Sequence, residues 1–338
     1  MHSERPKCSL RTATKPPGRR RYNCGPRDTQ AVHGIMGSST TNPRWGCVAI
    51  VGVGLIGGSI GLALRRAALA REVLGIGRDP DRLQLAQRLG AIDRWSLELV
   101  DAAHQAEIIV LSTPVQLIAA QAVELLQAPP RRAVVTDCGS IKGVIVEDVY
   151  GSLPRSDAKR FVPAHPLAGS ERSGVEHARA ELFQDRLCVL TPVEATDRAA
   201  IQTIESLWRS LGAKVQSMSP VAHDEFLAWT SHAPHAVAAA LVRSLPETAK
   251  PLVATGFLDT TRIAASSEEL WTPILLSNRD ALRRAIDAVM GELNVLKELL
   301  TAEDAPGIRR WWQQARHRRQ QLAESDPTAQ SPTDASER

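Results

Sequence analysis

The segment FVPAHPLAGSERSG, residues 161–174, places a single histidine, His165, beside proline and a run of small and hydroxyl residues. An unperturbed imidazole titrates at about pH 6.5, so His165 can accept a proton near neutral pH. A lone loop histidine is more often structural than catalytic. We therefore expect His165 to act as a general base only if the fold places a substrate or cofactor beside it.

A second segment, TDCGSIKG at residues 136–143, follows an apolar run and presents Ser140 and Lys142. Ser140 either caps the helix that follows, a common role for serine, or projects at the same edge of a sheet as His165. In the second case Ser140 and His165 belong to one site.

The run VGVGLIGGSIG contains the spacing G-x-G-x-x-G at Gly52, Gly54 and Gly57, with Leu55 and Ile56 between the last two. A strand pattern precedes it and a helix pattern follows. In that context the glycines allow a tight turn, close approach of a pyrophosphate and close packing of helix on strand. The motif predicts binding of NAD or NADP. The alternative is that residues 47–64, which carry no charge, span a membrane.

The choice between NAD and NADP depends on the end of the second strand, which reads GIGRDPDR. NAD-binding proteins usually place an acidic residue there, but this chain has Gly77 and Arg78, and Asp79 comes late. Arg78 can instead meet a 2′-phosphate, so NADP or dual use is slightly favoured. Thr113 and Pro114, in the segment LSTPV, either line the nicotinamide side or begin the next helix.

The second half of the chain adds two polar clusters. The segment at 219–235 carries His223, Asp224, Ser231, His232 and His235, and the last helix-spaced pair, Ser231 and His235, shares one helix face. The cluster lacks a clear metal-ligand pattern, so no metal is expected.

The other cluster, GFLDTTRIAASSEELW at residues 256–271, carries Asp259, Arg262 and Trp271. The guanidinium of Arg262 suits a substrate carboxylate, which it can hold through two parallel hydrogen bonds. The alternative is an ion pair with Asp259.

The order of the elements predicts an α/β Rossmann-type dinucleotide-binding domain followed by an all-helical dimerisation domain. Strands are expected at 47–52, 72–77, 106–114, 132–139, 160–166, 186–192 and 213–219, with an antiparallel strand or two near 160–190, and helices at 79–90, 115–127 and 196–211. Helices then follow at 220–245, 248–265, 278–301 and 306–322. The domains are placed at 45–219 and 220–322.

The ends of the chain differ from the body. Residues 1–44 hold nine Lys or Arg against two acidic residues, so this segment has a net charge of +7. Because the whole chain has a net charge of +4, the remaining residues carry −3. The body therefore gives no reason to expect nucleic acid. Residues 1–44 and 323–338 are predicted to be disordered. The basic extension is an RNA-binding or targeting tail, or lies upstream of a true start at Met36. Five scattered cysteines without a CxxC pair suit a reducing, cytoplasmic location.

Five motifs in order, GVGLIGGS, DCGSIKG, HPLAGSERSG, HD…SHAPH and GFLDTTRIA…W, resemble the prephenate/arogenate dehydrogenase family of tyrosine biosynthesis. The resemblance covers roughly residues 47–320. It implies oxidative decarboxylation of prephenate or arogenate with NAD or NADP, in a homodimer, without a membrane partner. It also allows tyrosine as a feedback inhibitor.

The resemblance implies a role for each matching residue. His165 would accept the ring hydroxyl proton, and Ser140 would bond that hydroxyl and orient His165. Arg262 would bind a substrate carboxylate. The remaining substrate contacts would be Ser231, His235, Ser170, Glu171 and Trp271, with His235 also the contact for a bound tyrosine.

Two other interpretations stay open. One is a two-domain dehydrogenase of the 3-hydroxyacid or imino-acid type, which shares the glycine motif but not the substrate motifs. The other is a non-catalytic dinucleotide sensor that acts through its basic N-terminal arm.

Overall fold

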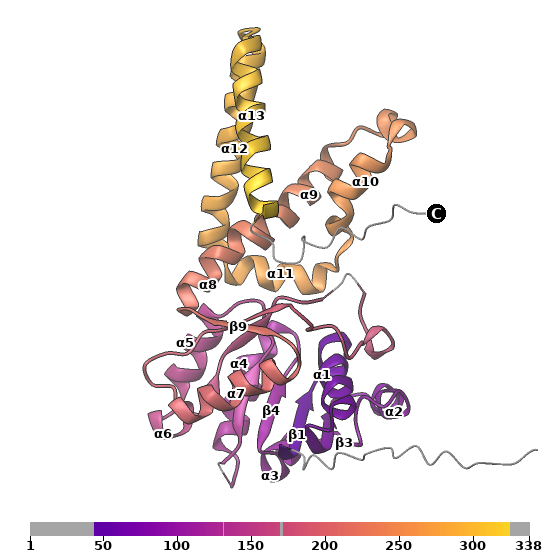
Figure 1. The fold of residues 1–338 in the computed structure, drawn as a ribbon, viewed down its shortest axis with the longest axis vertical. Helices are drawn as coiled ribbons and strands as arrows, with labels where there is room; N and C mark the ends of the chain where they lie inside the picture. Colours follow the sequence, from indigo (N-terminus) through magenta and orange to yellow (C-terminus); the bar gives the residue numbers. More distant parts are fainter. Residues whose placement is uncertain (1–43, 131, 170–171, 325–338) are drawn as a thin grey trace, which may run out of the picture. The chain divides into compact units, whose positions relative to one another are not determined.

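The computed structural model describes residues 44–130, 132–169 and 172–324, and its first part is built on a six-stranded parallel sheet (Figure 1). The strands lie in the order β3-β2-β1-β4-β5-β6. They are β1 (Trp45–Val51), β2 (Ala70–Ile76), β3 (Arg94–Ser96), β4 (Ile108–Leu111), β5 (Val134–Asp137) and β6 (Phe161–Val162). The prediction of a Rossmann-type sheet is confirmed by this order, which reverses between β1 and β4.

Helices cover both faces of this sheet, which explains why its central strands are apolar throughout rather than alternating. In β1, Val48 and Ile50 join the core beneath one layer, while Ala49 and Val51 join the core beneath the other. The first layer comprises α1 (Leu55–Arg66), α2 (Pro80–Arg88) and α7 (Arg198–Ser210). The second comprises α3 (Val100–Gln105), α4 (Val115–Gln127) and α5 (Gly143–Ser152), and the short α6 (Arg155–Ala158) follows α5.

A second, three-stranded sheet follows, in the order β7-β8-β9. It contains β7 (Ala164–Pro166), β8 (Leu187–Leu190) and β9 (Lys214–Ser217), with η1 (Val175–His177) between β7 and β8. The expectation of one strand over 160–166 is wrong. Pro163, which has no N–H to donate, separates β6 from β7, and the two belong to different sheets. The predicted antiparallel pairing in this region is confirmed for β7 and β8.

From residue 220 the described chain is helical. The elements are α8 (Pro220–Leu227), the π-helical η2 (Ala228–His232), α9 (Ala233–Ser244), η3 (Glu247–Leu252), α10 (Thr255–Thr261), η4 (Arg262–Ala265), α11 (Glu268–Ser277), α12 (Arg279–Thr301) and α13 (Ala305–Glu324). The expected single helix at 248–265 is wrong, because η3, which holds Pro251, and η4 flank a short α10. Helix α11 was not predicted.

The uncharged run at 47–64 forms β1 and α1, so the membrane interpretation of that run is wrong. Over residues 44–130, 132–169 and 172–324, no helix combines the length and apolar composition needed to cross a membrane.

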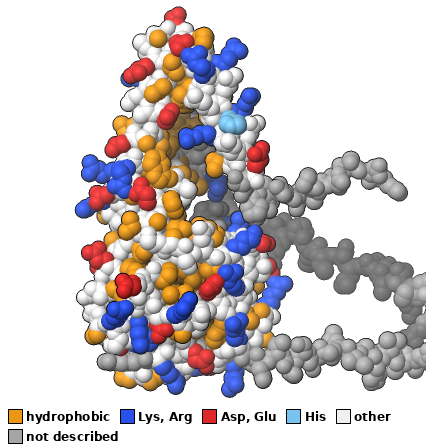
Figure 2. All heavy atoms as spheres, turned by 60° about the vertical axis from the view of Figure 1, so that its left-hand side comes forward, with side chains coloured by type: hydrophobic (Ala, Val, Ile, Leu, Met, Phe, Trp, Pro, Cys, Tyr) orange, Lys and Arg blue, Asp and Glu red, His pale blue; other side chains and the backbone are white. Residues whose placement is uncertain are grey.

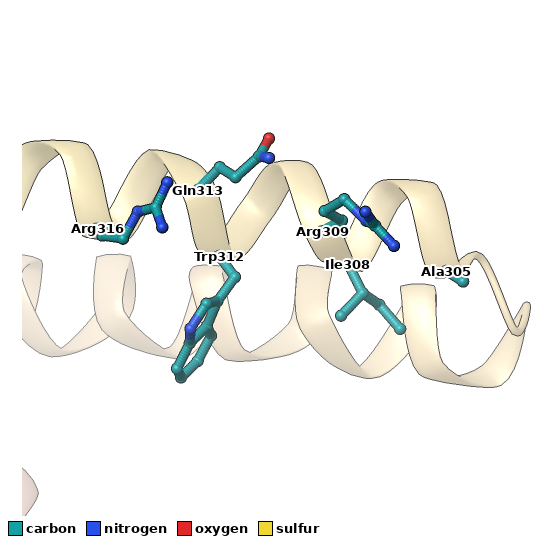
Figure 3. Close-up of a pocket in the computed structure, with 6 residues that line it drawn as sticks. All are labelled: Ala305, Ile308, Arg309, Trp312, Gln313 and Arg316. Carbon is teal, nitrogen blue, oxygen red and sulfur yellow. The ribbon is translucent and has the colours of Figure 1, made fainter.

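The helical part has a small core of its own and leaves much apolar surface exposed. The core contains Ala228, Ala233, Ala281, Leu282 and Ala285. Figure 2 shows apolar side chains gathered on the surface, and the exposed ones of the helical part include Leu241, Leu258, Leu276, Met290, Leu293, Leu300 and Trp312. A shallow hollow along α13, lined by Ile308, Arg309, Trp312 and Arg316 among others, belongs to this surface (Figure 3).

Trp208 of α7 is fully buried and packs edge-on against Phe183, with ring centroids 5.3 Å apart. We expect Trp208→Ala to lower the free energy of unfolding by about 3–5 kcal/mol, because it leaves a cavity in the core between α7 and the sheet. Urea denaturation followed by circular dichroism measures this. Leu97→Ala is the control, since Leu97 is 47% exposed and lies outside the helical part, and it should change stability by no more than about 0.5 kcal/mol. Equal losses in both variants would contradict the placement of Trp208.

Candidate active site

The carboxyl ends of β1 and β4 meet at the point where the strand order reverses, which is where open α/β sheets bind ligands. The turn after β1 begins at Gly52, whose φ of +88° favours glycine. A Cβ at Gly52 would lie 2.9 Å from the carbonyl oxygen of Ser112, just after β4. A Cβ at Gly57 would lie only 2.3 Å from the carbonyl oxygen of Gly52. These two glycines therefore let the turn close.

Gly54 differs from its neighbours, because nothing in the protein lies within 4 Å of a Cβ built on it. It precedes α1, whose N-terminus receives no hydrogen bond from any side chain among the described residues. The free N–H groups of that first turn and the open space beside Gly54 suit an anion such as a pyrophosphate. The residues present therefore fit a dinucleotide.

At the end of β2, Asp79 is occupied in capping α2, where its carboxylate accepts hydrogen bonds from the N–H groups of Asp81 and Arg82. Arg78 beside it is exposed. After β4, the hydroxyl of Thr113 donates to Gln121 at 2.5 Å, and Pro114 precedes α4. These residues follow β2 and β4, the two strands that flank β1 and its glycine turn.

His165 lies in β7 and is half buried. Its Nδ1 is 2.9 Å from Nε2 of His223 in α8, and the two rings meet edge to face with centroids 5.1 Å apart. Burial lowers the pKa of His165 well below its usual 6.5, and His223, Lys142 and His232 lower it further. A neutral imidazole is thus maintained at neutral pH, as a general base requires.

His223 is fully buried, and its Nδ1 lies 2.8 Å from a carboxylate oxygen of Asp224. The Asp224 carboxylate also accepts hydrogen bonds from the backbone N–H groups of Lys142, at 2.8 Å, and Gly143, at 2.7 Å. Lys142, not Ser140, occupies the N-cap position of α5, so the interpretation of Ser140 as a helix cap is wrong. The carboxylate of Asp224 replaces the missing side-chain cap at that helix end.

Lys142 itself is fully buried and pairs with Asp137 at the end of β5. Its Nζ also donates to the carbonyl oxygen of Ala164 at 2.7 Å, and the Ala164 N–H donates to Asp137 at 3.1 Å. This closed set of bonds ties β5 to the residue before His165, so it fixes where the imidazole stands.

The helical part contributes a second group of side chains. His235 Nδ1 donates to the carbonyl oxygen of Ser231 at 2.8 Å, and its ring stacks on Trp271 with centroids 3.7 Å apart. Burial lowers the pKa of His235, and the positive charge of Arg262 lowers it further. Burial likewise lowers the pKa of His232 to about 4. The His232 ring lies edge-on to Trp271, with centroids 6.0 Å apart, so Trp271 contacts both His232 and His235.

The structure thus brings Ser231, His235 and Trp271 together, with Arg262 near enough for its charge to act on His235, while His165 contacts His223. Ser140 is half buried; within the described chain the hydrogen bond of His165 goes to His223, and none joins it to Ser140. Ser170 and Glu171 lie outside the described residues. No cluster of His, Cys, Asp or Glu in the described part is arranged to hold a metal ion.

Sequence reasoning noted His223, Asp224 and Lys142 but gave them no role. Asp137 and Asn278, whose side-chain N–H donates to the Asp224 carbonyl oxygen at 2.7 Å, were not singled out. The partners of these five residues lie up to 82 residues away along the chain, as Lys142 and Asp224 do, so no local spacing signals the contacts.

A Rossmann-type sheet with an open glycine turn, a neutral half-buried imidazole and a following helical part define a two-domain, nicotinamide-dependent dehydrogenase. The chain matches two family models, "Prephenate dehydrogenase, nucleotide-binding domain" over residues 60–217 and "Prephenate dehydrogenase, dimerization domain" over residues 219–314. It belongs to the prephenate dehydrogenase family, whose members are NAD-dependent oxidoreductases.

Named relatives agree with this assignment. The chain is 34% identical over 282 residues to the prephenate dehydrogenase of Bacillus subtilis, covering 81% of this chain and 76% of that protein. It is 32% identical over 264 residues to the cyclohexadienyl dehydrogenase of Zymomonas mobilis, covering 76% and 89%.

Solved structures show the same likeness in three dimensions. The prephenate dehydrogenase of Aquifex aeolicus, in complex with hydroxyphenyl propionate and NAD+, superposes with a TM-score of 0.76 at 34% identity, covering 82% of this chain and 98% of that one. The Synechocystis arogenate dehydrogenase gives a TM-score of 0.70 at 30% identity, covering 82% and 99%.

Gly54 and Gly57 of the turn after β1 provide a matched pair of variants. We expect Gly54→Ala to leave the unfolding temperature within about 2 °C of wild type, because the methyl group has open space, yet to weaken cofactor binding at least about tenfold by blocking the pyrophosphate. Gly57→Ala should lower both stability and binding, because its methyl group meets backbone. Thermal unfolding and titration with NAD+ measure the two effects. Unchanged NAD+ affinity in Gly54→Ala would argue against this binding site.

Proposed function

We propose that this protein catalyses the oxidative decarboxylation of prephenate to 4-hydroxyphenylpyruvate and carbon dioxide, with transfer of a hydride to a nicotinamide dinucleotide. The observation that carries this proposal is the neutral imidazole of His165, held between the cofactor-binding sheet and the helical part. The family match and the hydroxyphenyl propionate bound by the Aquifex aeolicus relative support the substrate class.

The chemistry divides between substrate, cofactor and side chains. Loss of carbon dioxide makes the ring aromatic, so the substrate itself supplies most of the driving force. The nicotinamide, when bound, accepts the hydride. The protein's part is to align the ring, bind its carboxylates and remove the hydroxyl proton, and such orientation can contribute large rate factors.

His165 accepts the proton of the ring hydroxyl as the hydride leaves the ring carbon that carries this hydroxyl. Ser140 forms a hydrogen bond with the same hydroxyl. On the helical side, Arg262 binds a substrate carboxylate. His235, held by the Ser231 carbonyl and stacked on Trp271, presents its other nitrogen to the distal side of the substrate. Ser170 and Glu171 complete the proposed set from outside the described residues.

Arogenate is the second candidate substrate, since relatives named cyclohexadienyl and arogenate dehydrogenase match this chain almost as well. Rates with prephenate and arogenate, each with NAD+ and NADP+, test the proposal directly. Turnover of a 3-hydroxyacid and of neither cyclohexadiene would overturn it.

We also propose a homodimer formed by the exposed apolar surface of the helical part, in line with the matched dimerization domain. A monomer by light scattering at micromolar concentration would contradict this. The domain limits 45–219 and 220–322 and a cytoplasmic location are proposed with it.

Tyrosine, which shares the product's ring and carboxylate, is proposed as a competitive inhibitor at His235, so it should raise the KM for substrate without lowering kcat.

His165→Asn should lower kcat by about 10²–10⁴-fold while NAD+ binding survives, because the variant lacks the base but keeps the polar contact. In wild type, the acid limb of kcat/KM should lie below pH 6.5, since burial lowers the pKa of His165 and keeps its basic form at lower pH. Steady-state rates between pH 4.5 and 9 measure both. Undiminished turnover in His165→Asn would remove His165 from the mechanism.

Arg78→Ala tests the cofactor choice. If Arg78 binds the 2′-phosphate, the variant should raise the KM for NADP+ by about tenfold or more and leave the KM for NAD+ nearly unchanged, since only NADP+ carries the charged group. Arg82→Ala, in the first turn of α2, is the control. Equal effects on both cofactors would show that Arg78 does not discriminate between them.

A further inference from the structure

We infer that His223 and Asp224 are positioning residues that hold His165 with its Nδ1 protonated and its Nε2 free to accept the substrate proton. This inference rests on the proposed function and extends it from one imidazole to a relay of three side chains. The relay crosses from the second sheet, which carries His165, to α8 of the helical part, which carries the other two residues.

The direction of each hydrogen bond follows from the acceptor at the end of the relay. A carboxylate only accepts, so the 2.8 Å contact with Asp224 requires His223 to donate from Nδ1. His223 Nε2 is then the unprotonated nitrogen and accepts from His165 Nδ1 at 2.9 Å. His165 must carry its proton on Nδ1, which leaves Nε2 with a lone pair.

Hydrogen bonds from the backbone fix the orientation of the Asp224 carboxylate. Both of its carboxylate oxygens accept backbone N–H groups, one from Lys142 at 2.8 Å and one from Gly143 at 2.7 Å. Its own carbonyl oxygen accepts from Asn278 at 2.7 Å. The carboxylate is therefore oriented by the β5–α5 segment, while the backbone of Asp224 is tied to the residue that precedes α12.

The charges around His165 explain why a countercharge is needed. Burial opposes a positive charge on His165, and the ammonium group of Lys142 from the β5–α5 segment opposes it further. The Lys142 charge is paired with Asp137. Asp224, acting through His223, supplies the negative charge that favours the imidazolium once it forms.

The proton balance is simple. The substrate O–H bond breaks as His165 Nε2 gains the proton, and no second proton needs to move. The Nδ1–H of His165 and the Nδ1–H of His223 stay in place, and their hydrogen bonds shorten as charge develops. The Nε2 proton leaves to solvent after product release. A carboxylate that orients a catalytic imidazole and stabilises its charged form has the same role in serine proteases.

Paired variants at His223 separate positioning from packing. Gln at 223 keeps an acceptor near the position of Nε2, whereas Leu removes it. We expect His223→Leu to lower kcat by about 100-fold with the KM for substrate and NAD+ within about threefold of wild type, and His223→Gln to recover at least about tenfold of that loss. His104→Leu and His104→Gln, at an exposed position of α3, are the controls and should match wild type.

The tautomer is measured independently of turnover. In the full chain labelled with ¹⁵N-histidine, with His165→Asn used to assign the signals, wild-type His165 should show a protonated Nδ1 and an unprotonated Nε2 without any substrate present. In His223→Leu that preference should be lost.

A protonated Nε2 in wild-type His165 would overturn the relay, and so would equal turnover in His223→Leu and His223→Gln. If wild type turns over neither prephenate nor arogenate, the proposed function fails, and the tautomer measurement still decides the relay.

Discussion

The carboxylate of Asp224 is the contact on which the site depends. It belongs to α8 of the helical part, yet it binds the two backbone N–H groups that open α5 in the sheet domain. Through His223 it also reaches His165 in β7. One residue therefore joins the helical part to the cofactor-binding part and, through His223, contacts the imidazole that is proposed as the base.

Cofactor binding and proton transfer are built by different means. The cofactor side uses backbone geometry: a positive φ at Gly52, a close approach at Gly57 and free space at Gly54. The proton-transfer side uses side chains locked by buried bonds, of which the Lys142–Asp137 pair is the most enclosed. Such a buried pair contributes little net stability, since desolvation offsets its attraction, but breaking it is costly. Its value here is the fixed position it gives to Ala164 and His165.

Burial also controls the charge of the site. It is the largest cause of the lowered pKa values of His165, His232 and His235. The imidazoles are therefore neutral at pH 7 and do not add to the positive charge of Arg262 and Lys142. A substrate with two carboxylates then meets one exposed guanidinium rather than a cluster of competing cations.

Local patterns in the sequence were enough for the glycine turn, the parallel sheet and the helical second half, because these depend on spacing within a few residues of one another. The catalytic role of His165 stays a prediction. The short edge strand β3 and helix α11 were missed, because tertiary packing decided them rather than periodicity. The break between β6 and β7 was also missed, although Pro163, which has no N–H to donate, stands at that point. The partners of His165 could not be read from the chain. His223 and Asp224 look like ordinary residues in the first turn of a helix, and only folding brings α8 against β7 and α5 across 58 to 82 residues of chain.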